Sequence, residues 1–321
     1  MVAMLGIVGL CSSVRAEDAA SADGVTWLAA LDDKIGGEPG DAPAAKAAGW
    51  EKPIPIGFYL DYTMATDYIW RGQNFSEYGR EGRERLNHQL TAGVNLDTGD
   101  FGTIDFSVWL EWYGANEKVN AAGDSNLQEV DYTIAWTYDL SRLCPKLPVE
   151  LTLGWIGYDF PQTRNDPGFT NEYFIGLALD DQALFGESWF ALNPTLTYYQ
   201  DIDDVASGGQ GSWLEFGISH EFAAANCPIF GAVPVIKDLT LTPSFTLMMD
   251  IGYIDEATAV SSTLYGLEVG YDLGAALGLP EQYGSVSVTG FLNFSDAVAD
   301  NSSNININDE FWGGFSVGWE W

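Results

Sequence analysis

The sequence predicts an all-β protein, a transmembrane antiparallel β-barrel of about twelve strands behind an N-terminal lead-in. From residue 54 onward, apolar residues recur at every second position, in segments of about ten residues separated by turn-forming residues. This is the period of a strand, and the segment length suits a tilted strand that crosses a bilayer. Aromatic residues are abundant, with 17 Phe, 12 Trp and 15 Tyr, and they gather near segment ends, where interfacial belts lie.

The charge of the chain excludes one class of function. There are 46 acidic and 13 basic side chains, so the formal net charge is −33. Ordinary nucleic-acid binding needs a basic surface that displaces counterions from phosphate, and this chain cannot supply one. Disorder of the whole chain is also excluded, because 46% of the residues are hydrophobic.

The first part of the chain is expected to direct export. Residues 1–16 are predicted to be a signal peptide, because the apolar run from Val2 to Cys11 is too short to span a bilayer as a helix and small residues precede a cut before Glu17. Residues 17–53 are rich in Ala, Gly, Asp and Pro, and we expect a flexible periplasmic segment. Residues 54–321 would then form the barrel.

The strand pattern is clearest in residues 103–113. The even-numbered residues from Ile104 to Trp112 are apolar, whereas the odd-numbered positions include Asp105 and Glu111. The same alternation defines the predicted strands, which are 54–68, 86–97, 103–113, 128–140, 148–159, 171–180, 188–200, 212–223, 238–251, 261–273, 284–294 and 309–321.

The connections between the predicted strands indicate their orientation. Those after odd-numbered strands, such as 69–85 and 114–127, are long and polar, and most of those after even-numbered strands, such as 98–102, are short. Long loops outside and short turns in the periplasm are typical of outer-membrane barrels. The long apolar connection 224–237 is an exception.

Extension of the alternation to every strand places many carboxylates, and no base except Arg71, on the inward face. Because each unpaired buried charge costs several kcal/mol, the lumen is expected to hold water, cations or protonated acids. The candidate solute path comprises Asp61, Asp105, Glu111, Glu129, Asp131, Glu150, Glu172, Glu215, Asp250, Glu268, Asp272, Trp109, Tyr113 and Arg71. The inward aromatic residues either offer stacking platforms for solutes or simply fill a narrow lumen.

Two cysteines remain after the predicted cut, Cys144 and Cys227. In an oxidising compartment an even pair can close a disulfide. Such a bond would tie two periplasmic turns together. The alternative is two reduced thiols in loops.

The last strand ends in an alternating series, Phe315, Val317, Trp319 and Trp321. This series is similar to the C-terminal signal that bacterial outer-membrane barrels present to their insertion machinery, although Phe is the commoner last residue. The alternative is the edge strand of a soluble sheet.

Residues 66–72, T-D-Y-I-W-R-G, followed by Ser76, resemble the S-D-Y-x-F-R-G-x-x-x-S opening of a family of poorly characterised proteobacterial outer-membrane barrel proteins. Thr replaces Ser and Trp replaces Phe, and the resemblance covers about a dozen residues. It implies location more than activity. If the first strand continues regularly, Arg71 neutralises acids at the outer end of the lumen; otherwise Asp67 and Arg71 are a solvated loop pair worth less than about 1 kcal/mol.

These observations predict a porin-like channel of the bacterial outer membrane for passive diffusion of small hydrophilic solutes. An acidic lumen favours cations. We expect no cofactor, and the expected partners are outer-membrane lipid and lipopolysaccharide, the insertion machinery, and small solutes or cations. One alternative is a non-conducting structural or adhesive barrel whose acidic loops, around Asp201 and Asp300, bind calcium.

An outer-membrane enzyme is the weaker alternative. The sequence contains neither G-x-S-x-G nor H-E-x-x-H. His88 and His220 both have outward parity near strand ends, which indicates an interfacial position. We therefore predict no catalytic residues.

Overall fold

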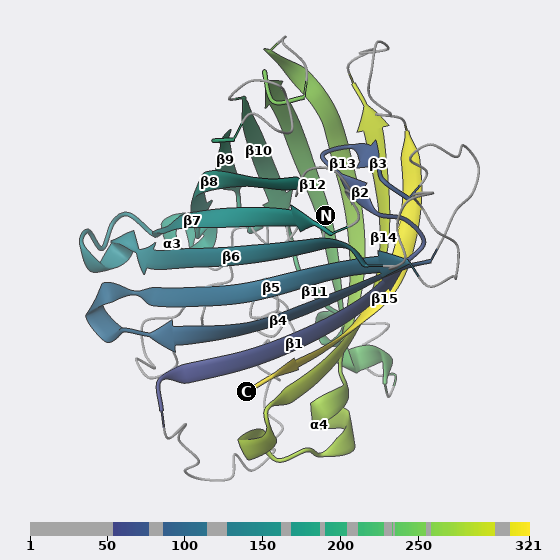
Figure 1. Cartoon of the computed structure of the whole chain (residues 1–321). Coiled ribbons are helices and arrows are strands. Elements are labelled where there is room, and N and C mark those ends of the chain that lie inside the picture. Colours follow the sequence, from purple (N-terminus) through teal and green to yellow (C-terminus); the bar gives the residue numbers. More distant parts are fainter. Residues whose placement is uncertain are drawn as a thin grey trace.

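The structure, a computed structural model, is a closed antiparallel β-barrel (Figure 1). It describes residues 54–76, 86–113, 127–161, 168–186, 190–203, 211–227, 233, 235–254, 258–298 and 309–321. The predicted signal peptide and lead-in lie outside these residues. The strands are β1 (Ile56–Ala65), β2 (Ile69–Trp70), β3 (Gln73–Asn74), β4 (Asn87–Asp97), β5 (Thr103–Tyr113), β6 (Leu127–Asp139), β7 (Val149–Phe160), β8 (Gly168–Leu179), β9 (Thr195–Asp201), β10 (Ser212–Ser219), β11 (Phe222–Ala223), β12 (Leu239–Ile251), β13 (Thr258–Asp272), β14 (Ser285–Ala297) and β15 (Glu310–Glu320).

The barrel closes because β1 pairs with β15 and β10 pairs with β12, in addition to pairing between chain neighbours. The sheet has thirteen strands, of which β11 is a two-residue addition to β12, so twelve strands form the wall. The predicted twelve-strand barrel is confirmed. Several boundaries differ from prediction, and the largest differences are that β1 ends at Ala65, β9 begins only at Thr195 and β10 ends at Ser219.

The turns opposite the long loops are compact. The β8–β9 connection contains the short helix α3 (Asp181–Phe185), and the β13–β14 connection contains α4 (Leu273–Leu277). Each helix is capped by the side chain of the preceding aspartate, Asp180 or Asp272, which accepts a backbone N–H. No helix in the described residues is long and apolar enough to cross a membrane.

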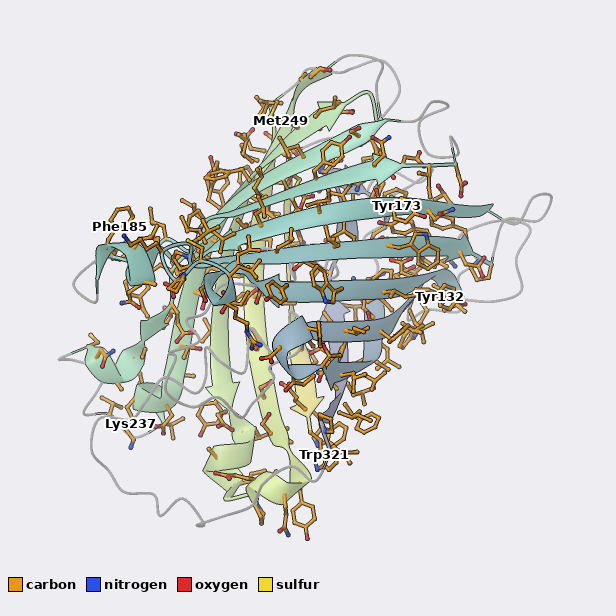
Figure 2. All side chains as sticks on the ribbon, turned by 90° about the vertical axis from the view of Figure 1, so that its left-hand side faces the viewer. Tyr132, Tyr173, Phe185, Lys237, Met249 and Trp321 are labelled. Carbon is orange, nitrogen blue, oxygen red and sulfur yellow. The ribbon has the colours of Figure 1, made fainter. Side chains whose placement is uncertain are left out.

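The outer face of the wall is apolar and exposed. Leu60, Phe106 and Tyr173 are 43%, 49% and 56% exposed. Figure 2 shows Tyr132 and Tyr173 directed away from the strands. Exposure of such a surface to water would be unfavourable, whereas contact with acyl chains would not. Lipid also offers no hydrogen-bonding partners, and each wall strand meets this condition by pairing on both sides.

An aromatic cluster lies at the loop-bearing end of the outer face. His88 stacks on Trp112 with ring centroids 5.7 Å apart, and its Nδ1 is 2.6 Å from the Tyr62 hydroxyl. Rings with one polar atom are suited to the bilayer interface. This placement agrees with the interfacial position expected for His88.

A second set of aromatic residues lies at the opposite, turn-bearing end. Trp136 stacks on Tyr138 at 5.6 Å, and His220 stacks on Phe190 at 3.8 Å. His220 also bonds the carbonyl of Ala191 through Nδ1, at 2.6 Å. His220 therefore lies in an aromatic cluster at the end of the barrel opposite His88, and a position of both clusters at a membrane interface stays a prediction.

The C-terminal residues belong to the seam of the barrel. Phe315, Val317 and Trp319 are exposed on the outer face of β15, and Trp321 pairs with the backbone of Phe58 on β1. They occupy the positions expected of an insertion signal, whose role stays a prediction.

The disulfide considered above is not formed in the described part of the structure. Cys144 is exposed in the β6–β7 turn, and Cys227 is half-buried after β11. These turns are four wall strands apart, or about 19 Å at the usual strand spacing, whereas disulfide formation needs Cα atoms within about 7 Å.

Substitution of a charge into the apolar band tests its contact with lipid. Leu60→Arg, at the middle of β1, is expected to lower the free energy of unfolding by about 2–4 kcal/mol, because a guanidinium would enter hydrocarbon. Val298→Arg, an exposed position just beyond β14, should change it by less than about 0.5 kcal/mol. Urea titration in lipid vesicles measures both, and equal effects would contradict the lipid-facing assignment.

Candidate functional site

The chain leaves the barrel wall directly after β1 and folds inward. The Thr66 N–H still donates to the carbonyl of Gly313 on β15, and residues 66–76 then form a hairpin in which β2 pairs with β3. Figure 1 shows these two short strands apart from the strands of the wall. The expected regular continuation of the first strand to residue 68 is therefore wrong. We call residues 66–76 the inner hairpin.

The turn of the inner hairpin explains part of the motif recognised in the sequence. Arg71 and Gly72 have φ angles of 50° and 79°. Two successive positive φ angles in a two-residue loop define a type I′ turn, the type whose twist matches paired strands. Gly72 meets this requirement without strain, whereas Arg71 does not.

Other motif residues hold the hairpin together by hydrogen bonds. The Ser76 hydroxyl accepts from the Tyr68 N–H at 2.6 Å, and the Asn74 side chain accepts from the Ser76 N–H at 2.9 Å. Asn74 also donates to Asp67 at 3.4 Å. The motif residues therefore stabilise the loop by hydrogen bonds among themselves, and Asp67 accepts one of these bonds from Asn74.

On one side the inner hairpin contacts β5 and β6. The Tyr68 hydroxyl donates to Glu129 at 2.8 Å, and its ring packs on Trp109 with centroids 5.5 Å apart. The Tyr113 hydroxyl donates to the carbonyl of Phe75 at 3.0 Å. Burial, and then the nearby Glu129 carboxylate, raise the pKa of Tyr68, so Tyr68 remains a donor. Trp109 and Tyr113, which were expected on the solute path, contact the hairpin inside the barrel, and their contact with a solute stays a prediction.

On the other side, Arg71 is completely buried against β8–β10. Its Nη2 donates to both oxygens of Glu172, at 3.1 and 2.9 Å, and Tyr158 also donates to this carboxylate. Burial alone would lower the pKa of Arg71, but Glu172 raises it and the net shift is upward. Arg71 therefore stays charged. The expected neutralisation of lumen acid is observed, and the alternative of a solvated loop pair is wrong.

Four aromatic rings surround the Arg71 guanidinium. Its Cζ lies 4.0 Å from the ring centroid of Tyr253, 4.5 Å from Trp70, 5.0 Å from Tyr199 and 5.2 Å from Trp213. All four distances are within the range of cation–π attraction. We call Glu172 and these four rings the Arg71 cage.

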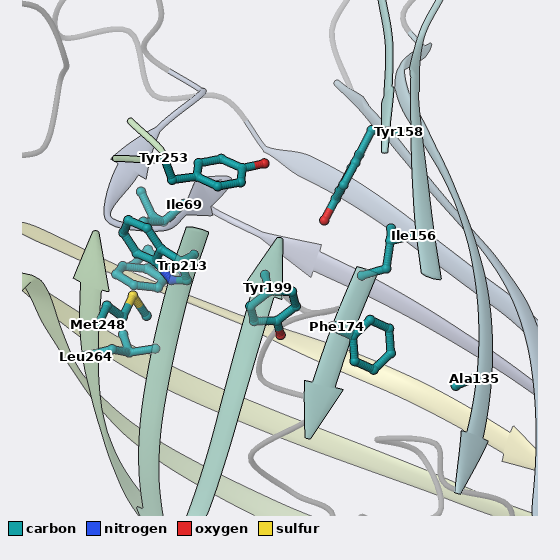
Figure 3. Close-up of a cluster of buried hydrophobic side chains, with 11 residues drawn as sticks. Ile69, Ala135, Ile156, Tyr158, Phe174, Tyr199, Trp213, Met248, Tyr253 and Leu264 are labelled. Atoms are coloured by element: carbon teal, nitrogen blue, oxygen red, sulfur yellow. The ribbon is translucent and has the colours of Figure 1, made fainter. Parts of the chain in front are cut away.

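The Arg71 cage continues into an apolar cluster inside the barrel. Figure 3 shows Ile69 of the hairpin beside Tyr253 and Trp213, with Met248 and Leu264 next to them. Ile69 is 1% exposed. The inner hairpin is thus anchored to the wall by hydrophobic burial as well as by charge.

The predicted inward acids lie inside the barrel. Three of the predicted acids, Glu150, Glu268 and Asp272, are only partly buried. Among the buried charged residues that the structure describes, Arg71 is the one base. The buried acids of the predicted set are Asp61, Asp105, Glu111, Glu129, Asp131, Glu172, Glu215 and Asp250.

Most of the buried acids have neutral partners. Tyr59 donates to Asp105 at 3.0 Å, Thr63 donates to Asp61 at 2.9 Å, and Trp213 donates to Glu215 at 2.9 Å. Asn87 donates to Glu111. Neutral donors satisfy lone pairs without cancelling charge, so the interior carries an excess of acid over base.

Two of the predicted path residues have local structural roles. Asp250 accepts the N–H groups of Tyr253 and Ile254, at 2.6 and 3.2 Å, and so fixes one ring of the Arg71 cage. Asp272 caps α4 by accepting the Ala275 N–H at 2.7 Å. Asp272 is thus both the last residue of β13 and the cap of α4, and its place on the solute path stays a prediction.

Sequence reasoning missed two cage residues. Trp213 has the same inward parity as Glu215 two positions later, so the alternation contained the signal. Tyr253 follows β12 in a loop, and no pattern in the sequence indicated its position.

The calcium alternative has no support from the described residues. No group of three or more His, Cys, Asp or Glu side chains suited to a metal ion occurs among them. Asp201 instead accepts the Asp203 N–H at 3.0 Å in a local turn. The second expected calcium loop, around Asp300, lies largely outside the described residues.

Comparison with protein-family models finds no match, and comparison with curated proteins finds none either. Among solved structures, the NanC porin is similar over 81% of this chain and 98% of its own, with 10% identity and a TM-score of 0.43. An outer membrane channel from Pseudomonas putida F1 is similar over 88% and 100%, with 10% identity and a TM-score of 0.46. Outer membrane phospholipase A from Escherichia coli is similar over 82% and 92%, with 11% identity and a TM-score of 0.38. The site is therefore interpreted from its own geometry.

A double-mutant comparison tests the buried ion pair. Arg71→Met should lower the free energy of unfolding by about 3–5 kcal/mol, because Glu172 is left buried without its partner. Arg71→Met combined with Glu172→Gln should recover at least about 1 kcal/mol of that loss. Urea titration in vesicles measures both variants, and a double variant that is less stable than the single one would contradict a buried, paired Glu172.

Proposed function

We propose that the protein is a porin-like channel of the bacterial outer membrane that passes small hydrophilic solutes by passive diffusion and prefers cations. The observation that carries the proposal is the charge of the barrel interior. Eight predicted lumen acids are buried inside a closed wall, and Arg71 is the one buried base in the described residues. Carboxylates that line a pore lower the energy of a cation and raise that of an anion.

Some of the buried carboxylate oxygens have no hydrogen-bond donor among the described residues. Asp61 Oδ2, Glu111 Oε2 and Asp131 Oδ1 are buried and accept no hydrogen bond from the described residues. A buried carboxylate oxygen in this state strongly favours a counter-ion or a proton. Lumen acids that remain ionised would therefore favour passing cations over anionic solutes of the same size.

The membrane location is proposed from the same barrel. Its exposed apolar band and two aromatic clusters suit lipid, with lipopolysaccharide as the expected outer neighbour. The exposed Phe315, Val317 and Trp319 on β15 support recognition by the insertion machinery. No covalent chemistry is proposed, since His88 and His220 lie in the outer-face clusters and not among the lumen acids.

The inner hairpin favours a second candidate, a non-conducting structural barrel. It joins Ile69 and Arg71 to side chains from β8, β9 and β10 within the lumen. A loop packed this way narrows the interior. The two functions differ in a single measurable quantity, the conductance of the intact barrel.

Planar-bilayer recording separates these functions. In a potassium chloride gradient, the channel is expected to show a reversal potential of the sign that marks cation preference. Absence of conductance would support the structural barrel, and anion preference would overturn the proposal.

Neutralisation of a lumen acid tests the origin of selectivity. Glu268→Gln is expected to reduce the potassium-to-chloride permeability ratio about fourfold, because one charge about 10 Å from an ion in water lowers the energy of K⁺ and raises that of Cl⁻ by about 0.4 kcal/mol each. Asp238→Asn, an exposed acid paired with Lys237 near the start of β12, is the matched control and should leave the ratio unchanged. Equal effects of the two variants would show that net charge, and not the lumen, sets selectivity.

A further inference from the structure

We infer that the Arg71 cage is a recognition site for guanidinium-bearing cations, which the inner hairpin occupies as a tethered internal ligand. The inference deepens the proposed function by naming a class of cationic solute. It rests on that function in one respect, which is that the solute reaches the cage through the lumen of the channel. A free guanidinium compound would compete with Arg71 for the same side chains.

Most of the cage belongs to the barrel and not to the hairpin. Glu172 lies on β8, Tyr199 on β9, Trp213 on β10, and Tyr253 in the loop after β12. Only Trp70 comes from the hairpin. The wall therefore presents a buried carboxylate and three ring faces to any cation that takes the place of Arg71.

The chemistry of the cage suits a planar cation. The guanidinium donates to Glu172 through Nη2, while its Nε and Nη1 have no hydrogen-bond acceptor among the described residues. Ring faces surround the rest of the group, and a guanidinium stacks on such faces better than a compact, strongly hydrated ammonium. A small guanidinium compound can thus reproduce the contacts that Arg71 makes.

The charge around the cage also favours a cation. Glu172 is directly opposite Asp201 in the β8–β9 register, and Glu215 accepts from the Trp213 ring nitrogen. Without Arg71, three neighbouring carboxylates would share the site with no described buried base. Their attraction acts in a region from which water is largely excluded, where it is least screened.

The backbone indicates that Arg71 is placed there for its side chain. Its φ angle of 50° lies in the left-handed region, where Asn and Gly are favoured in a type I′ turn. Strained residues persist where the surrounding structure demands them, and they concentrate at ligand-binding and switch regions. The contacts of the Arg71 side chain in the cage explain why a strained residue is kept at this position.

Arg71→Gly provides the direct test, because it removes the guanidinium and relieves the strained turn. The probe is methylguanidinium, titrated into the refolded barrel in detergent at constant ionic strength and followed by calorimetry. Arg71→Gly should gain saturable, millimolar binding, and the intact protein should bind at least tenfold more weakly because Arg71 fills the cage.

Two matched variants make the test specific. Arg142→Gly removes an arginine of the β6–β7 turn, whose Nη1 donates to the Gly99 carbonyl far from the cage, and it should gain no binding. Adding Glu172→Gln to Arg71→Gly should weaken binding at least tenfold. If Arg71→Gly binds no better than Arg142→Gly, or if Glu172→Gln has no effect, the inference is wrong.

A second measurement uses the native arginine, so it does not depend on the folding of Arg71→Gly. In a background with Cys11, Cys144 and Cys227 changed to serine, Gln73→Cys reports exposure of the hairpin to a maleimide reagent. Labelling should accelerate severalfold and saturably with methylguanidinium, but not with sodium chloride at equal ionic strength. An equal response to both salts would overturn the inference.

Failure of this inference is distinguishable from failure of the proposed function. Both measurements are made without ion conduction. Binding without conductance would contradict the channel but retain the cage, whereas conductance without binding would contradict the cage alone.

Discussion

The fold depends on one constraint, the absence of hydrogen-bonding partners in lipid. Every backbone N–H and C=O that crosses the bilayer must pair within the protein, and the wall meets this by joining β1 to β15 and β10 to β12. Closure fixes which face of each strand is inside. Because side chains alternate, one face then carries Leu60 and Phe106 to lipid, and the other carries Asp61 and Asp105 to the lumen.

Closure creates an interior that must be filled or solvated, and the inner hairpin fills part of it. The Arg71–Glu172 pair joins a loop to the opposite wall inside this space. Such a pair is not strong evidence for added stability, because desolvation offsets much of the attraction. The ion pair instead fixes the position of the hairpin, because the Arg71 guanidinium is held by a carboxylate and four aromatic rings.

The wall could be predicted from the sequence because one rule governs it. The alternation of apolar and polar residues predicted all twelve wall strands, and it also predicted that acids such as Glu111 and Glu172 face inward. It could not locate the inner hairpin, because residues 66–76 leave the wall and contact residues far away in the sequence, such as Glu172, which is 101 positions from Arg71. It also gave no sign that Asp272 caps α4, since parity at a strand end does not reveal a helix in the following turn.

The distance in sequence between the hairpin and its cage also constrains assembly. The inner hairpin follows the first wall strand, whereas its partners come from β8, β9, β10 and the loop after β12. Contacts with such long separations form late, after the intervening loops have been closed. The lumen is therefore filled only when most of the wall exists, and burial of Arg71 marks completed folding of the barrel.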